Sequence, residues 1–114
     1  MVLQEVRIEN YGKILIFKLG PTVTLIGWAN ANGAPILSCD VPTGVDATTG
    51  FAPGDYIRPA ATLALGVPKT GLLREKVGKL YLADIGLVAG TFAKVGIEYQ
   101  SPFGDKFTVP LMIN

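Results

Sequence analysis

Short apolar runs separated by glycine and proline extend along the whole chain, and they predict many short elements joined by tight turns. Residues 2–9 alternate weakly, with Val6 and Ile8 between the charged residues 5, 7 and 9, which is the period of a half-buried strand. After a turn at 10–12, residues 13–19 (KILIFKL) are mostly β-branched, apolar or aromatic. We therefore expect an N-terminal β-hairpin.

One helix is predicted by a polar residue at its start and a glycine at its end. Thr22 can cap residues 23–31, and Asn32-Gly33 would stop the helix in the left-handed conformation. The predicted buried stripe consists of Leu25, Ile26, Trp28 and Ala29. We expect Trp28 to pack in the core or to contact the sheet from the helix rather than to stack on a ligand.

Three continuous apolar runs are typical of strands buried in a parallel sheet. They cover residues 34–39, 60–67 and 79–83. The loop at 41–59 is rich in Gly, Pro, Asp and Thr, and loops of this length in compact domains are often functional. A short helix or turn is expected at 72–78, before the third run.

The C-terminal part is less regular. Residues 88–100 show no clear period, and a turn is expected at 101–105. Residues 106–112 (KFTVPLM) predict a last strand, which Pro110 would confine to the edge of a sheet. The chain is thus expected to form one α/β domain with a mostly parallel sheet and an added N-terminal hairpin.

Each of the three apolar runs ends near a charged residue followed by turn residues. If the strands are parallel, Asp40, Lys69 and Asp84 lie at one edge of the sheet. Ligands of open α/β sheets bind beyond the carboxyl ends of the strands, so these residues are candidates for a binding site. Each also fits an ordinary role, the aspartates as turn residues and the lysine as a solvated charge.

Composition excludes several kinds of chemistry. The 114 residues include no His and one Cys, which excludes imidazole catalysis, an internal disulfide and a thiolate zinc cluster. The net charge of +1 gives no basic surface for DNA or RNA. Cys39 lies in an apolar run without a partner base, and we expect a small buried side chain rather than a reactive thiol.

The loop at 40–50 (DVPTGVDATTG) combines carboxylate, hydroxyl and carbonyl oxygens. Such hard ligands suit K⁺, Mg²⁺ or Ca²⁺ rather than zinc, although the spacing is not that of an EF-hand. No apolar run is long enough for a signal peptide or a membrane span. We expect a cytoplasmic protein with no membrane partner and no nucleic-acid partner.

Four segments resemble the NAD(P)H-hydrate epimerases, the YjeF N-terminal domain family. Residues 37–50 (LSCDVPTGVDATTG) are similar to the family's D-[IV]-P-[ST]-G segment, and residues 61–72 (ATLALGVPKTGL) to its A-x-x-T-x-x-x-P-K-x-G-L segment. Residues 78–86 (GKLYLADIG) look like its G-x-[LV]-x-[VL]-A-D-I-G segment. Residues 25–35 are similar to the helix before the first of these segments.

The resemblance implies a partial Rossmann-like three-layer α/β sandwich, commonly a homodimer or higher homo-oligomer. It covers residues 23–114 as the C-terminal half of the family's domain, with residues 1–22 as an unrelated hairpin. The implied reaction interconverts the R and S epimers of hydrated NADH and NADPH (NADHX and NADPHX). Asp40 corresponds to a substrate-binding and catalytic carboxylate, and Thr43 to a ligand of K⁺. Lys69 and Asp84 remain candidate substrate-binding residues.

A second interpretation stays open. The family's first half carries a G-x-G-N-N-G-G-D-G loop that cradles the dinucleotide, and this chain contains no such loop. The chain could therefore be a non-catalytic remnant that acts as a small nucleotide-binding or self-assembling α/β domain.

Overall fold

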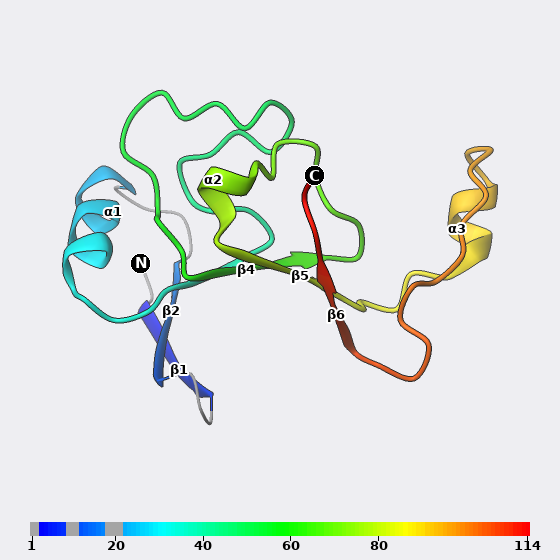
Figure 1. Ribbon diagram of the computed structural model, residues 1–114, viewed down its shortest axis with the longest axis horizontal. Coiled ribbons are helices and arrows are strands. Elements are labelled where there is room, and N and C mark those ends of the chain that lie inside the picture. Colours follow the sequence, from blue (N-terminus) through cyan, green and yellow to red (C-terminus); the bar gives the residue numbers. More distant parts are fainter. Residues whose placement is uncertain (1–2, 9–11, 18–21) are drawn as a thin grey trace.

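The computed structural model describes residues 3–8, 12–17 and 22–114. The turn predicted at 10–12 lies largely outside these residues, and Gly12 is already the first residue of a strand. None of the described helices is long and apolar enough to cross a membrane. In chain order (Figure 1), the elements are β1 (Leu3–Ile8), β2 (Gly12–Phe17), α1 (Thr22–Ala31), β3 (Leu37–Cys39), β4 (Ala61–Leu65), α2 (Arg74–Val77), β5 (Lys79–Ala83), α3 (Ala89–Ala93) and β6 (Thr108–Leu111).

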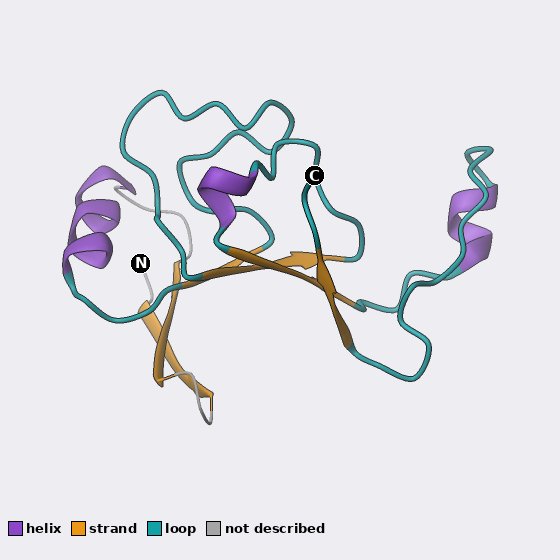
Figure 2. Cartoon of the chain, viewed as in Figure 1, coloured by secondary structure: helices purple, strands orange, loops and turns teal. Residues whose placement is uncertain are grey.

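A four-stranded sheet in the order β3-β4-β5-β6 forms the centre of the fold (Figure 2). The first three strands are parallel and β6 is antiparallel to β5. The three predicted parallel strands are confirmed, as is the mixed α/β class with a partial Rossmann-like arrangement. Pro110 lies opposite Tyr81 on the terminal strand of the sheet, where its missing N–H breaks no ladder.

The predicted hairpin is also confirmed, as an antiparallel pair of β1 and β2. It forms a sheet of its own, and β2 lies beside β3 without joining the ladder of the central sheet. In the view of Figure 1, the hairpin extends to the side of the sheet opposite α2. The hairpin is thus a separate layer beside β3 rather than an extension of the sheet.

Helix α1 buries a narrower face than predicted. Ile26 and Ala29 are buried, whereas Leu25 is half-buried and Trp28 is 49% exposed. The prediction that Trp28 packs in the core is wrong, because a residue two positions after Ile26 points to nearly the opposite side of a helix with 3.6 residues per turn. The predicted stop is confirmed, since Gly33 follows the helix with a φ of 76°.

Asn30 joins α1 to the end of the long loop. Its Nδ2 donates to the carbonyl oxygen of Tyr56 at 2.8 Å, and its Oδ1 accepts the amide of Arg58 at 2.9 Å. Ile57, between these two residues, packs in a small apolar cluster with the buried side chains of α1 and with Ile36. This double hydrogen bond holds the returning loop in line with the start of β4.

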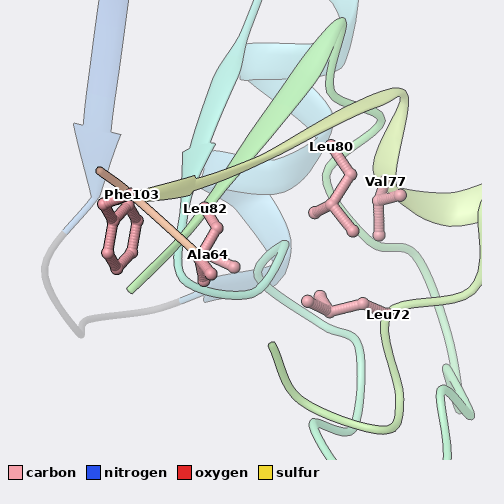
Figure 3. Packing of buried hydrophobic residues seen from close by; sticks show 6 residues of the cluster. All are labelled: Ala64, Leu72, Val77, Leu80, Leu82 and Phe103. Carbon is pink, nitrogen blue, oxygen red and sulfur yellow. The ribbon is translucent and has the colours of Figure 1, made fainter. Parts of the chain in front are cut away.

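The main apolar core lies between the sheet, α2 and the C-terminal segment. Figure 3 shows its buried members, Ala64, Leu72, Val77, Leu80, Leu82 and Phe103. Thr62 is fully buried among them and donates its hydroxyl to the carbonyl oxygen of Val77 at 2.8 Å. The core therefore contains a satisfied polar side chain that joins β4 to the last residue of α2.

Cys39 is exposed, so the prediction of a buried thiol is wrong. Successive residues of a strand face opposite sides, and on β3 the buried position is Ser38. Strand β3 is also the terminal strand of the central sheet, which leaves Cys39 less covered than a residue of β4.

The long loop predicted at 41–59 is confirmed as a connection without helix or strand between β3 and β4. Its first part is bonded to the turn after β4. Gly71 donates its amide to the carbonyl oxygen of Ala47 at 2.8 Å, and Thr70 Oγ1 donates to that of Thr48 at 2.6 Å. These contacts hold the segment after Asp40 against the segment after Lys69.

Asp46 organises the turn within this loop. Its Oδ1 accepts the amides of Thr48 and Thr49, at 2.9 and 2.7 Å, and the hydroxyl of Thr49 at 2.9 Å. The bond from the amide of Thr49 contributes most to lowering the pKa of Asp46, followed by the Thr49 hydroxyl and the amide of Thr48. These hydrogen bonds thus stabilise the ionised form of the carboxylate more than its protonated form.

The segment 88–99, which includes α3, extends beyond the core. Helix α3 buries none of its residues, and Figure 1 shows it projecting at the end of the molecule away from α1. Phe92 and Tyr99 stack on each other with ring centroids 4.0 Å apart. Stacking of these two rings therefore joins α3 to the chain that follows it and stabilises the projecting segment locally.

Gly71 has no space for a side chain. A Cβ on this residue would overlap backbone atoms of Asp46, Ala47 and Gly50. We expect Gly71→Ala to reduce the free energy of unfolding by about 2–3 kcal/mol, as overpacking does. As a control, Gly27→Ala in α1 meets no atom within 4 Å and should raise stability by roughly 0.5–1 kcal/mol. Urea titration of both variants measures the difference; equal stabilities would contradict the close approach.

The lowered pKa of Asp46 predicts a pH-dependent contribution to stability. Because the folded pKa is below the unfolded one, the stabilisation is present above about pH 4 and is lost as the pH falls through the folded pKa. Asp46→Asn should melt at a lower temperature than the wild type at pH 7, and this difference should vanish in strong acid. Asp105→Asn, at an exposed turn, serves as the control, and a pH-independent difference for Asp46→Asn would refute the linkage.

Candidate functional site

Asp40 stands directly after β3 in a strained backbone conformation. Its φ is 71°, and the amide of Val41 donates to the carbonyl oxygen of Cys39 at 3.0 Å, which closes a γ-turn centred on Asp40. A left-handed φ at a residue with a side chain costs on the order of 1–3 kcal/mol and is often found at functional sites. The turn directs the chain away from the sheet at the point where the carboxylate is presented.

The carboxylate of Asp40 forms an ion pair with Lys69. Lys69 Nζ lies 2.5 Å from Asp40 Oδ1, and the same oxygen accepts the amide of Leu65 at 3.2 Å. The side chains of Lys69 and Asp40 are 30% and 38% exposed, so the pair is partly shielded and still open to solvent. Two of the three predicted site residues are therefore brought together at the carboxyl ends of β3 and β4.

The turn after β4 repeats the backbone geometry found after β3. Gly66 has a φ of 71°, and the amide of Val67 donates to the carbonyl oxygen of Leu65 at 2.8 Å. This second γ-turn carries the chain back towards Asp40, where Lys69 Nζ also donates to the carbonyl oxygens of Leu65 and Val67, both at 3.3 Å. Glycine accepts this conformation without strain, whereas Asp40 does not.

Asp84 has a different environment. It follows β5, its amide donates to the carbonyl oxygen of Phe107 at 2.9 Å, and its Oδ1 accepts the amide of Gly86 at 2.8 Å. The described hydrogen bonds of its side chain are thus those of a turn residue, and they do not connect Asp84 to the ion pair of Asp40 and Lys69.

Thr43 is half-buried in the loop three residues after Asp40. Its carbonyl oxygen accepts the amide of Ile57 at 2.9 Å. Within residues 23–114, whose side chains the structure describes, no group of three or more His, Cys, Asp or Glu side chains could hold a metal ion. Thr43 lies in the same loop as Asp40, and its backbone carbonyl oxygen is already used to hold the returning part of that loop.

Cys39 precedes Asp40 but does not have the character of a nucleophile. Partial burial of its thiol and, to a lesser degree, the charge of Asp40 raise the pKa of Cys39. A thiol with a raised pKa is mostly protonated near neutral pH, and protonated thiols are poor nucleophiles. The exposed thiol is therefore expected to be unreactive.

The amide of Leu65 and the glycine at 66 are parts of the site that the sequence reasoning missed. The sequence pattern predicts Leu65 only as a strand residue, yet its amide donates to the carboxylate of Asp40. Gly66, at the end of an apolar run, was the available signal, since a glycine at such a position often marks a turn with positive φ.

Comparison with known proteins assigns this arrangement to a family. Residues 18–71 match the family of YjeF-related protein N-termini. The chain is 46% identical over 93 residues to an NAD(P)H-hydrate epimerase of Dehalogenimonas lykanthroporepellens, covering 81% of this chain and 38% of the epimerase. It is also 43% identical over 91 residues to the human Enhancer of mRNA-decapping protein 3, covering 75% of this chain and 15% of that protein.

Among solved structures, the chain is similar to the yeast protein YNL200c, with a TM-score of 0.60 and 27% identity over 83% of this chain and 42% of that one. The chain thus spans well under half the length of the relatives it matches. The shared sequence includes the loop that begins at Asp40 and the turn that carries Lys69. The chain belongs to the family of YjeF-related N-terminal domains.

Proposed function

We propose that the protein takes part in NAD(P)H-hydrate epimerisation, with Asp40 as the catalytic and substrate-binding residue. The observation that carries this proposal is the ion-paired carboxylate at the carboxyl ends of parallel strands, in a stretch 46% identical to an epimerase. Substrates of α/β sheets bind beyond this edge. The chain spans 38% of that epimerase, so the activity of the whole enzyme is part of the proposal.

A carboxylate suits the reaction. Epimerisation of NADHX or NADPHX can proceed by loss of the hydroxyl group at C6. The hydroxyl group takes up a proton and leaves as water, and the ring becomes a cation. Water then adds to the other face of C6 and releases a proton. Asp40 can donate and accept these protons and can stabilise the cation by its negative charge.

The other predicted ligands fit this proposal to different degrees. Asp84 remains a candidate substrate-binding residue, although its described side-chain bond belongs to a turn. Thr43 remains the potassium ligand suggested by the resemblance, and no step is assigned to potassium. A homodimer or higher homo-oligomer also stays a prediction, which sedimentation equilibrium would test.

A second candidate function is non-catalytic binding of a dinucleotide. The chain is almost as similar to Enhancer of mRNA-decapping protein 3 as to the epimerase, and the name of that protein refers to a different process. This similarity favours a function without epimerase turnover. The same half of the fold is therefore found in proteins of different function. In this case the protein would bind the nucleotide at the Asp40 edge without turnover.

Asp40→Asn tests the catalytic proposal. The amide keeps the shape of the side chain but cannot exchange a proton as a carboxylate does. We expect NMR of an epimer-enriched NADHX sample to show mixing of the epimers at least about a hundredfold slower than with the wild type. Asp105→Asn removes the same charge at an exposed turn and should behave as the wild type. Mixing by the wild type no faster than without protein would refute the catalytic proposal.

Ligand binding separates the two candidate functions. With NADH or NADPH well above the dissociation constant, the melting temperature should rise by about 4 °C or more under both. A rise without acceleration of epimer mixing would favour the non-catalytic binding domain. Absence of any rise at millimolar nucleotide, with no turnover, would argue against both.

A further inference from the structure

We infer that Lys69 is a positioning residue for the carboxylate of Asp40 rather than a ligand of the substrate. The effect of Lys69 on catalysis rests on the proposed function. The placement of the carboxylate by Lys69 does not, and it can be tested without turnover. The sequence predicts Lys69 only as one of three charges at the same edge of the sheet, and its contacts in the structure give it a narrower role.

The ammonium group of Lys69 has all of its donors engaged. A lysine carries three N–H donors, and Lys69 Nζ has three acceptors among the described residues. These are Asp40 Oδ1 at 2.5 Å and the carbonyl oxygens of Leu65 and Val67, both at 3.3 Å. The ammonium therefore has no N–H left for a substrate, unless one of these bonds is broken.

The contacts to Asp40 select one of its two oxygens. Lys69 Nζ and the amide of Leu65 both donate to Oδ1. The amide of Asp40 itself donates to the carbonyl oxygen of Leu63, as the next residue of β3 would do in the parallel ladder. The ladder would then continue with a bond from the Leu65 amide to the carbonyl oxygen of Asp40. The carboxylate oxygen Oδ1 takes the place of that carbonyl oxygen. With Oδ1 held in this way, Oδ2 is the oxygen available to an incoming substrate.

The strained turn makes this support necessary. A γ-turn with positive φ is unfavourable for an aspartate, and it persists only where surrounding contacts outweigh its cost. Lys69 supplies a charge-assisted hydrogen bond, which is stronger than a neutral one. Because its stem begins after the second γ-turn, at Gly66, Lys69 joins the two turns and fixes the direction of the carboxylate.

The test compares Lys69→Met with Lys69→Arg, using Lys94→Met as the control for loss of a lysine at an exposed site. The first readout is NMR of the amide of Leu65 and of the side-chain carboxyl carbon of Asp40. In Lys69→Met the Leu65 amide should exchange with solvent faster, and both resonances should move, whereas Lys69→Arg and Lys94→Met should resemble the wild type. This readout does not depend on activity.

The second readout is the kinetics of epimer mixing. For a positioning role, Lys69→Met should lower kcat by about ten- to a hundredfold while KM changes little, since misplacement of a catalytic group affects mainly the transition state. Lys69→Arg should recover most of the loss. If Lys69→Met does not fold, Lys69→Leu, which also removes every donor, is judged by the same criteria.

Two results would overturn the inference: an unchanged Leu65 amide in the folded variant, or a rise in KM with kcat unaltered, which would make Lys69 a substrate ligand. Failure of the proposed function is a different result, because the wild type itself would then not accelerate epimer mixing. In that case the NMR readout still decides whether Lys69 positions the carboxylate.

Discussion

The parallel hydrogen bonding of three short strands is the constraint on which the rest of this structure depends. Since β3, β4 and β5 run in the same direction, their carboxyl ends meet at one edge, and the residues that follow them come close together. Leu65 in β4 pairs with Ala83 in β5, and its amide reaches the side chain that follows β3. The site is thus a direct continuation of the ladder, with a carboxylate in place of a carbonyl group.

Two segments distant in the sequence must fold together for this edge to form. The loop after Asp40 and the turn after β4 share hydrogen bonds at Ala47 and Thr48, and the absence of a side chain at Gly71 permits their close approach. Asn30 holds the far end of the same loop against α1. A long connection without secondary structure is therefore fixed at both ends by specific polar contacts.

Much of this arrangement could be predicted from the sequence. Continuous apolar runs identified the three parallel strands, and the charges after them indicated the edge where Asp40 and Lys69 meet. The exposure of Trp28 and Cys39 could not be predicted from apolar character, because it depends on which side of a short element faces the core. The contact of the Leu65 amide with Asp40 depends on a γ-turn, and an aspartate at position 40 does not by itself predict this backbone conformation.

The left-handed backbone at Asp40 has a consequence for the divergence of such domains. Glycine is the residue that this conformation accepts most readily, so a change from aspartate to glycine would relieve backbone strain while it removed the carboxylate. Backbone strain therefore favours this change, whereas the loss of the hydrogen bonds from Lys69 and from the Leu65 amide opposes it, together with any selection for the chemistry. A domain that no longer used the acid would thus exchange relief of strain at this turn for loss of the contacts that join the ends of β3 and β4.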